Sequence, residues 1–276
     1  MSKQDLRGKV AVITGGGRGI GLAIAQAMAK KGVAVGLWGR NKETLDAAAQ
    51  AIVNSGGQAF PVVCDVADKD AILSAVAETE KALGPISILV NNAGVQGPNG
   101  PFWTNDPDEW WHALEVNLKG PMLCTHALLP QMREAREGCV INVGSYIAID
   151  PCPPASAYST SKAALLRLTD SIAEGVRDVG VTVFAISPGY VWTDMTKEID
   201  QERQLHDPNY EPPAKDWTFL PEDAANLCLR LASGEADKLT GRMIHVRDDL
   251  DTMIETADDI IEKDQYALRL TIELDD

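Results

Sequence analysis

Positive charge is scarce in this sequence. The 276 residues carry 25 Lys and Arg against 40 Asp and Glu, which gives a formal net charge of −15 at pH 7. Nucleic acids and anionic membranes attract basic proteins, so this balance argues against both as partners. It also disfavours docking to a strongly acidic carrier protein. A local basic patch would need Arg133, Arg136, Arg167 and Arg177 to gather, and the alternative is a scatter of solvated charges on helix faces.

Cysteine patterns typical of metal or disulfide sites are also missing. The five cysteines are scattered without metal-ligand spacing: Cys64, Cys124, Cys139, Cys152 and Cys228. We interpret them as reduced structural residues and expect no metal site. No apolar run is long enough to span a bilayer, and the N-terminus does not resemble a signal peptide. We therefore expect a cytoplasmic protein, and its 45% hydrophobic content suffices for one large α/β domain.

A short β-branched run ends in a cluster of glycines near the N-terminus. Residues 9–14 read Lys-Val-Ala-Val-Ile-Thr, residues 15–21 read Gly-Gly-Gly-Arg-Gly-Ile-Gly, and a helical pattern follows. Glycine lets the chain turn sharply and lets a pyrophosphate approach the backbone, while the start of a helix supplies unpaired N–H groups. Strand, glycine turn and helix together predict a dinucleotide site, and the alternative is an ordinary tight turn.

The rest of the chain alternates between strand-like runs and helix-length segments. The runs lie at 33–38, 59–64, 86–91, 138–143, 181–187 and 242–246. Apolar strands separated by helices indicate a parallel sheet covered on both faces. Ligands of such doubly wound sheets bind at the carboxyl ends of the strands, so the residues after the strands should line one crevice. These residues are Gly15, Asp65, Asn91, Ser145 and Pro188.

A tyrosine, a lysine and a serine have the layout of a proton-transfer site. Lys162 follows Tyr158 by one helical turn, and Ser145 lies 13 residues before the tyrosine. A tyrosine hydroxyl titrates near ~10 and is a poor acid or base at neutral pH unless its phenolate is stabilised. An ammonium on the same helix face could lower its pKa, and the serine would orient a carbonyl or alcohol. An isolated pair of this spacing is commonly a solvated surface pair.

Taken in order, these motifs resemble the short-chain dehydrogenase/reductase family in its single-domain, 3-oxoacyl reductase-like form. The resemblance covers roughly residues 7–246 and implies a Rossmann-type doubly wound parallel sheet. It rests on residues 14–21, on Asn-Asn-Ala-Gly at 91–94, on Asn117, on Ser145, on Tyr-Ser-Thr-Ser-Lys at 158–162 and on Ser-Pro-Gly at 187–189.

The family implies a catalytic role for four residues. Tyr158 would be the general acid in reduction or the base in oxidation. Lys162 would lower the pKa of the tyrosine and bind the nicotinamide ribose, and Ser145 would hydrogen-bond the substrate oxygen. Asn117 would help to hold a water in a proton relay, the alternative being a solvated amide on a helix face. The hydride transfer itself belongs to the nicotinamide cofactor.

The choice between NAD and NADP depends on charge, because only NADP carries a 2′-phosphate. NAD sites usually place a carboxylate after the second strand, whereas Gly39-Arg40-Asn41 follows it here. Arg40 suits a phosphate, and Arg18 needs an anion to compensate for its place beside a helix start. Relatives that use the phosphorylated cofactor often carry basic residues at both positions. We therefore predict NADP (NADPH in reduction) rather than NAD, and the alternative is two solvated arginines.

The resemblance assigns further residues to the cofactor. Asp65 and Val66 would contact the adenine, Asn91 its ribose and Thr193 the nicotinamide carboxamide, although a helix-capping role competes for Asp65. The complete predicted set is Gly15, Arg18, Gly19, Ile20, Gly21, Arg40, Asp65, Val66, Asn91, Ala93, Gly94, Tyr158, Lys162, Pro188, Gly189, Val191 and Thr193.

The sequence says less about the substrate than about the cofactor. By analogy it should contact Ser145, Gln96, Ile147, Tyr190 and Trp192. Aromatic and apolar groups favour a mid-sized, partly apolar carbonyl or alcohol. Residues 194–217, which include three prolines, are polar and are predicted to form a lid.

The C-terminus departs from the family pattern, so we divide the chain into a main domain of 1–246 and an extension of 247–276. Ile254, Ala257, Ile260 and Ile261 recur at helical spacing, and residues 266–272 alternate loosely like a strand or extended arm. The apolar stripe must be buried, either on a neighbouring subunit or the substrate cleft, or equally well on its own domain.

Two functions of different classes remain. The favoured one is a homo-oligomeric oxidoreductase, dimer or tetramer, that interconverts a carbonyl and a secondary alcohol. The alternative is an NADP(H)-binding regulatory or scaffold protein with little turnover.

Overall fold

The computed structural model describes residues 5–206, 211–214 and 218–269. Its centre is a seven-stranded parallel sheet in the order β3-β2-β1-β4-β5-β6-β9. The strands are β1 (Val10–Thr14), β2 (Ala34–Gly39), β3 (Gln58–Val63), β4 (Ile88–Asn91), β5 (Gly138–Val143), β6 (Val181–Ser187) and β9 (Met243–His245). The prediction of a Rossmann-type, doubly wound parallel sheet is confirmed.

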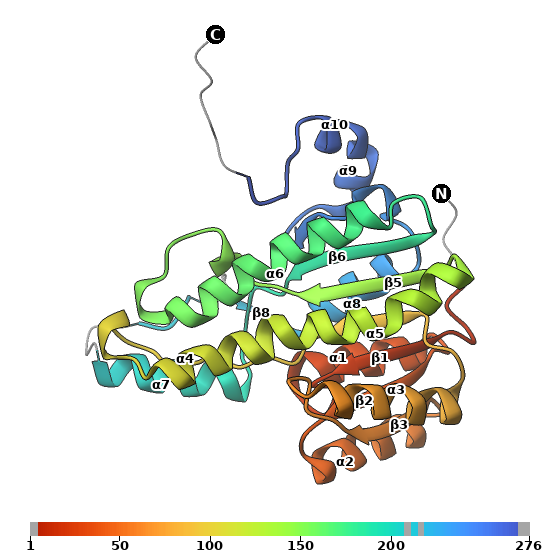
Figure 1. Cartoon of the computed structure of the whole chain (residues 1–276), viewed down its shortest axis with the longest axis horizontal. Coiled ribbons are helices and arrows are strands. Elements are labelled where there is room, and N and C mark those ends of the chain that lie inside the picture. The colour runs from red at the N-terminus through yellow and green to blue at the C-terminus, as the bar shows by residue number, and fades with distance from the viewer. Residues whose placement is uncertain (1–4, 207–210, 215–217, 270–276) are drawn as a thin grey trace.

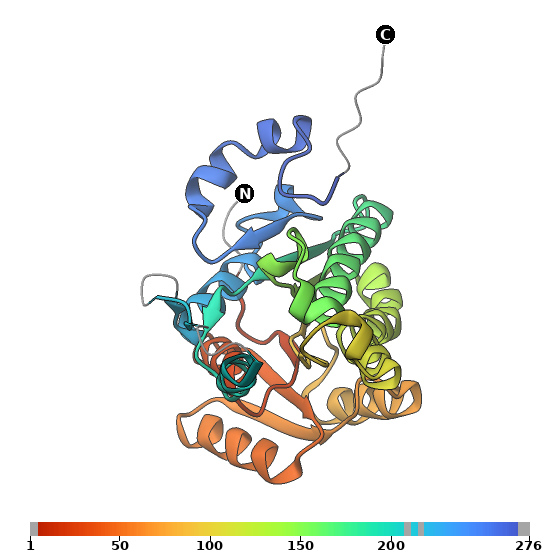
Figure 2. The same cartoon turned by 90° about the vertical axis from the view of Figure 1, so that its left-hand side faces the viewer.

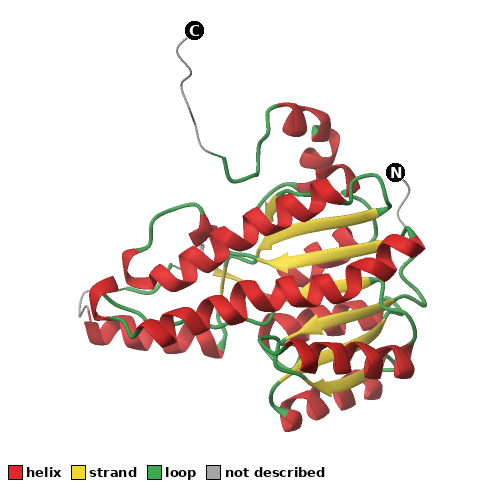
Figure 3. Cartoon of the chain, viewed as in Figure 1, coloured by secondary structure: helices red, strands yellow, loops and turns green. Residues whose placement is uncertain are grey.

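Helices cover both faces of this sheet (Figures 1 and 3). One face carries α1 (Gly19–Lys30), α2 (Lys42–Asn54) and α8 (Pro221–Ala232), whose buried residues form one hydrophobic cluster with the strands. The other carries α3 (Lys69–Leu83), α5 (Gly120–Ala135) and α6 (Ser156–Gly175), which share a second cluster. The inner strands β1, β4, β5 and β6 are largely apolar because both of their faces are buried, whereas the edge strand β3 is mostly half-buried or exposed.

Local capping explains where several helices begin. Asp68 accepts hydrogen bonds from two backbone N–H groups at the start of α3, and Asn41 caps α2 in the same way with one. Asp106 caps α4 (Pro107–Leu114), which runs into α5 through a π-helical turn at Glu115–Lys119. Short polar side chains at these positions satisfy N–H groups that have no partner within the helix.

The sequence pattern did not predict two very short strands. β7 (Tyr190–Val191) and β8 (Thr218–Phe219) pair in parallel with each other, outside the main sheet. Two residues are too few to produce a period-two signal. Between them lies α7 (Asp194–His206), which begins the segment predicted as a lid. The remainder of that segment falls partly at 207–210 and 215–217, outside the described residues.

The C-terminal extension forms two short helices, α9 (Leu250–Glu255) and α10 (Ala257–Glu262), where the sequence suggested one helical stripe. Their buried residues Leu250, Met253, Ala257 and Ile260 join the hydrophobic cluster of α1 and α8. The extension therefore packs on the domain of its own chain. Residues 266–269 are not a strand, and 270–272 of the expected arm lie outside the described residues.

Candidate active site

A cleft of about 610 Å³ opens at the carboxyl ends of the central strands. It lies where β1 and β4 are neighbours, the point at which the strand order reverses and open α/β sheets bind their ligands. Figure 2 views the molecule from this end, where α4 and α7 project beyond the sheet. Predicted residues that line the cleft are Gly15, Arg18, Gly19, Ile20, Arg40, Asp65, Val66, Ala93, Gly94, Tyr158, Lys162, Pro188, Trp192 and Thr193.

The glycine turn closely approaches the neighbouring loop. Gly15 and Gly19 have φ angles of +64° and +56°, a left-handed conformation that glycine adopts without strain. A Cβ atom on Gly21 would lie 2.4 Å from the carbonyl oxygen of Gly15 and 2.5 Å from Nδ2 of Asn92. Gly21 does not itself line the cleft. Its lack of a side chain lets α1 start directly beneath the turn.

Tyr158 and Lys162 lie one turn apart on α6, as the spacing predicted. The Nζ atom of Lys162 is 5.4 Å from the centre of the Tyr158 ring and donates a 2.8 Å hydrogen bond to the carbonyl oxygen of Val143. Lys162 is buried and Tyr158 is half-buried, and both line the cleft. The Ser145 hydroxyl lies near enough to the Tyr158 hydroxyl to lower the pKa of the tyrosine through hydrogen bonding. Tyrosine, lysine and serine are thus brought together.

The two ionisable groups are strongly affected by burial. Burial raises the pKa of Tyr158 to about 12, and the hydrogen bond with Ser145 offsets part of this rise. Burial also lowers the pKa of Lys162 to about 8. The direction at Tyr158 is opposite to the one expected from the sequence, because desolvation of the phenolate outweighs the stabilising contacts. The hydroxyl therefore keeps its proton at neutral pH.

Asn117 is fully buried in the π-helical turn between α4 and α5. Its Nδ2 donates to the carbonyl oxygen of Val95 at 2.8 Å and to Oγ of Ser161 at 3.0 Å, and its Oδ1 accepts from the N–H of Val95 at 2.9 Å. A solvated amide is therefore the wrong interpretation of this residue. Asn117 fixes the loop after β4 against α6, and π-helical turns are frequent at functional sites.

The two arginines predicted to bind phosphate differ in their surroundings. Arg18 forms a 3.2 Å ion pair with Asp194, the first residue of α7, so the anion that compensates its place at the helix start is supplied by the protein. This corrects the expectation that a 2′-phosphate is needed for that purpose. Arg40 is exposed at the end of β2, lines the cleft and forms no ion pair with the described residues.

Asp65 faces the cleft and is not a helix cap. Its Oδ1 accepts a 3.0 Å hydrogen bond from the N–H of Ala67 in the turn after β3, while Asp68 caps α3. The competing capping role is therefore wrong for Asp65. Val66 is buried beside it and contributes an apolar wall to the cleft.

Several predicted cofactor and substrate residues do not line the cleft. Asn91 is buried and donates to Oδ1 of Asn142 at 2.8 Å, so it links β4 to β5. Val191 is buried in β7. Tyr190 donates its hydroxyl to Asp200 of α7 at 2.6 Å. Ser145 does not line the cleft itself but lies beside Tyr158, which does. The other predicted residues outside the cleft lining are Gly21, Asn91, Gly189, Val191, Gln96, Ile147, Tyr190 and Asn117.

The cleft is also lined by residues outside the predicted cofactor and substrate sets, among them Asn92 of the Asn-Asn-Ala-Gly motif at 91–94. Asn92 lines the cleft, and its Nδ2 donates to the carbonyl oxygens of Thr14 and Gly15, which holds the glycine turn in place. Lys197, on the first turns of α7, lines the cleft and is exposed. The sequence did not point to Lys197 as a cleft residue, because it lies in a helical segment far along the chain from the glycine turn.

Metal-ligand groups and membrane-spanning helices are not found among the described residues. In the described ranges, no group of three or more His, Cys, Asp or Glu side chains is arranged to hold a metal ion. None of the helices described is both long and apolar enough to cross a bilayer. All five cysteines are free thiols, and only Cys152 is not buried.

This combination of a doubly wound sheet, a glycine turn and a Tyr–Lys–Ser group at its carboxyl edge defines a nucleotide-dependent oxidoreductase. Comparison with known proteins identifies the family of this oxidoreductase. The family described as short chain dehydrogenase matches residues 9–204. The chain is 35% identical to a short chain dehydrogenase of Pseudocercospora fijiensis (strain CIRAD86), over 92% of this chain and 85% of that protein. It belongs to the short-chain dehydrogenase family, and it is an NAD(P)-dependent oxidoreductase of CH–OH groups.

Two solved structures of similar proteins agree with this fold. A xylitol dehydrogenase with bound NAD⁺ superposes with a TM-score of 0.81 at 26% identity, over 88% of this chain and 98% of that one. A single-residue variant of an actinorhodin polyketide ketoreductase with NADPH gives 0.80 at 27% identity, over 86% and 95%. The two similar proteins hold different cofactors.

Proposed function

We propose that this chain interconverts a carbonyl and a secondary alcohol with NADP(H), and that Tyr158 is the general acid and base. The observation that carries the proposal is the meeting of the Tyr158 hydroxyl with Ser145, beside the buried Lys162, at the wall of the cleft. A protonated hydroxyl at neutral pH is what reduction requires, since the carbonyl oxygen must receive a proton as the carbon receives hydride.

The residues share the work of reduction as follows. When bound in the cleft, NADPH would supply the hydride for the carbonyl carbon. Ser145 donates a hydrogen bond to the carbonyl oxygen and orients it, and Tyr158 gives that oxygen its proton. The charge of Lys162 stabilises the tyrosinate that remains until solvent protonates it again. Asn117 acts through position, because its amide holds Val95 and Ser161 around this group.

The preference for NADP rests on Arg40. It stands at the end of β2, where NAD sites usually place a carboxylate, and it is free to form a bidentate contact with a 2′-phosphate. Arg18 supports this less than its sequence position suggested, since Asp194 already pairs with it. The similar ketoreductase solved with NADPH favours the same choice, and the similar xylitol dehydrogenase solved with NAD⁺ favours the other.

Assembly and location complete the proposal. We propose a homo-oligomer built on the face of α4, α5 and α6, where Trp111 of α4 and Met122 of α5 are exposed apolar side chains. The free cysteines support a reducing compartment such as the cytoplasm. Light scattering after size exclusion tests the first point, because a monomer would contradict it. Cell fractionation tests the second.

The function itself is tested by following NADPH and, separately, NADH at 340 nm with panels of ketones, aldehydes and sugars. Oxidation of NADPH by one carbonyl class, with at least tenfold weaker use of NADH, is the expected result. A preference for NADH of tenfold or more would overturn the cofactor assignment, and the absence of turnover with every carbonyl would overturn the reaction.

A further inference from the structure

A second pocket is lined by residues of α6, β6 and β9 and of the C-terminal extension. Its volume is about 310 Å³, room for about ten non-hydrogen atoms. Leu166 of α6, Ala185 of β6 and Met243 of β9 form its apolar wall. Residues 266–268 of the C-terminal extension also line it, which makes this segment part of the pocket rather than a loose end.

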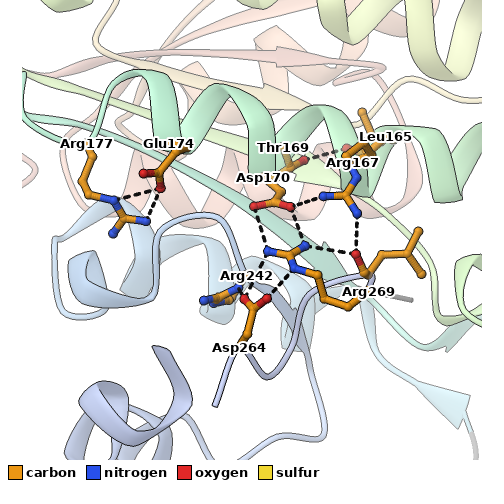
Figure 4. A network of polar contacts seen from close by, with 10 residues as sticks. Leu165, Arg167, Thr169, Asp170, Glu174, Arg177, Arg242, Asp264 and Arg269 are labelled. Carbon is orange, nitrogen blue, oxygen red and sulfur yellow. Dashed lines mark hydrogen bonds and ion pairs between the residues drawn. The ribbon is translucent and has the colours of Figure 1, made fainter. Parts of the chain in front are cut away.

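A network of arginines and aspartates fastens this segment to the domain (Figure 4). Arg269 pairs with Asp170 of α6 at 2.6 Å and with Asp264. Arg242, buried at the start of β9, pairs with the same Asp264 at 2.7 Å. Arg167 donates to the carbonyl oxygen of Leu268 at 2.6 Å, and the N–H of Met243 donates to the carbonyl oxygen of Tyr266. Residues 266–269 are thus fixed both to α6 and to the start of β9.

His245 gives the pocket one defined polar group. Its Nδ1 accepts a 2.9 Å hydrogen bond from the N–H of Arg247, so in the neutral ring the proton is on Nε2. Burial lowers the pKa of His245, which keeps the ring neutral at pH 7. The ring also packs edge-on against Tyr146 at 5.9 Å and against Phe219 at 5.4 Å between centroids. Its position is therefore fixed by contacts on several sides.

Tyr146 joins this pocket to the proposed catalytic group. It lines the pocket, and the residue directly before it is Ser145, which hydrogen-bonds to Tyr158. Consecutive Cα atoms are about 3.8 Å apart, so one wall of the pocket and the proposed catalytic group belong to the same short stretch of backbone. Tyr146 is 54% exposed, and so has room to turn aside.

We propose that this pocket binds the apolar end of the carbonyl substrate, a neutral alkyl or aryl group, while the carbonyl itself meets Ser145 and Tyr158. The proposal rests on the function proposed above and names the substrate class more narrowly. The two carboxylates at the pocket, Asp170 and Asp248, are already paired, Asp170 with Arg167 and Arg269 and Asp248 with the N–H of His245. Among the described residues that line the pocket there is no Lys or Arg to attract an anionic group, so acidic substrate tails are disfavoured.

The test uses methyl ketones from 2-butanone to 2-decanone with NADPH. If the alkyl chain enters the pocket, kcat/KM should rise by up to about fourfold for each added methylene until the pocket is full. Arg269→Ala, which releases the segment, and Ala267→Trp, which fills the space, should flatten this rise, because the longer ketones then gain nothing from the pocket. The matched control is Arg177→Ala, because Arg177 is similarly exposed and, within the described part of the chain, forms an ion pair with Glu174 alone, near the far end of α6 (Figure 4).

Loss of the chain-length gain in both pocket variants, with the gain intact in Arg177→Ala, is the expected result. A gain that persists in Ala267→Trp would overturn the proposal while the proposed reaction stands. If no ketone is reduced, binding of the neutral naphthyl ketone prodan at saturating NADPH decides separately. A blue-shifted emission abolished by Ala267→Trp supports the pocket, and an unchanged emission overturns it.

Discussion

The ammonium of Lys162 lies 5.4 Å from the centre of the Tyr158 ring and donates a hydrogen bond to the carbonyl oxygen of Val143. Because Val143 ends β5 and Lys162 belongs to α6, this bond fixes the helix against the carboxyl edge of the sheet. The lysine charge is therefore held beside the tyrosine whether or not the hydroxyl ionises. Burial keeps that hydroxyl protonated, which is the state that the proposed reduction requires.

Removal of the Tyr158 hydroxyl should abolish catalysis but not binding. In Tyr158→Phe we expect turnover to fall by about 10²–10⁴, since the proton donor is lost. The affinity for NADPH, followed by its fluorescence, should change less than threefold. Ser159→Ala is the control, because the neighbouring hydroxyl that it removes only donates to the carbonyl oxygen of Ser156 and lies outside the cleft lining. Unaltered turnover in Tyr158→Phe would show that the Tyr158 hydroxyl is not the proton donor.

The rate of reduction should fall as the pH rises through about 8. Tyr158, with a pKa of about 12, stays protonated over the usual range, whereas Lys162, with a pKa of about 8, loses its charge. We expect kcat/KM for reduction to be level from pH 6 to 7 and to decline above 8. Lys162→Arg should show no inflection there at whatever rate it retains, because arginine stays charged. A profile that is level to pH 9.5 in the native protein would contradict this.

Loss of folding would not account for that decline. The pKa of Lys162 is lower in the fold than its ordinary value of 10.5, so between pH 8 and about 10 the unfolded chain binds more protons at this residue. Stability then rises with pH across this window as far as Lys162 is concerned. Tyr158 has the opposite sign, but its contribution is lost only above pH 10. Thermal melts at each pH separate the two effects.

The sequence predicted the sheet and the Tyr–Lys pair well because both depend on local patterns. Apolar runs mark strands buried on two faces, and a spacing of four places two side chains on one face of a helix. The pKa of Tyr158 could not be predicted this way, since burial comes from segments distant in the chain. The pair of Arg18 with Asp194 joins residues 176 positions apart and gave no sequence signal.

Arg40 should decide between the two cofactors. In Arg40→Ala we expect the KM for NADPH to rise by roughly 10- to 100-fold, the loss of a charge-assisted contact of about 1.5–3 kcal/mol, with the KM for NADH nearly unchanged. Lys42→Ala is the control, because Lys42 is two residues away and pairs with Asp46 on the outside of α2. An equal rise in the KM for NADPH and for NADH would show that Arg40 does not recognise the 2′-phosphate.

Gly21 should not tolerate even a methyl group. In Gly21→Ala the Cβ atom would lie 2.4 Å from the backbone oxygen of Gly15, so the glycine turn must shift. We expect a loss of about 1–3 kcal/mol in urea unfolding and weaker NADPH binding. Gly175→Ala, at the end of α6 with nothing within 4 Å of the new atom, should be neutral or gain up to about 1 kcal/mol. The same cost at both positions would rule out a steric cause.

The C-terminal extension should stabilise its own chain. Ile260 of α10 is 4% exposed within the cluster of α1 and α8, so Ile260→Ala should lower the free energy of unfolding by about 2–4 kcal/mol. Leu73→Ala in α3 is the control, since that side chain is 49% exposed and should cost within about 0.5 kcal/mol. Contacts within one chain do not depend on concentration, whereas contacts between subunits do. The loss should therefore be the same over a hundredfold range of protein concentration, and a loss that disappears on dilution would instead place these helices on a neighbouring subunit.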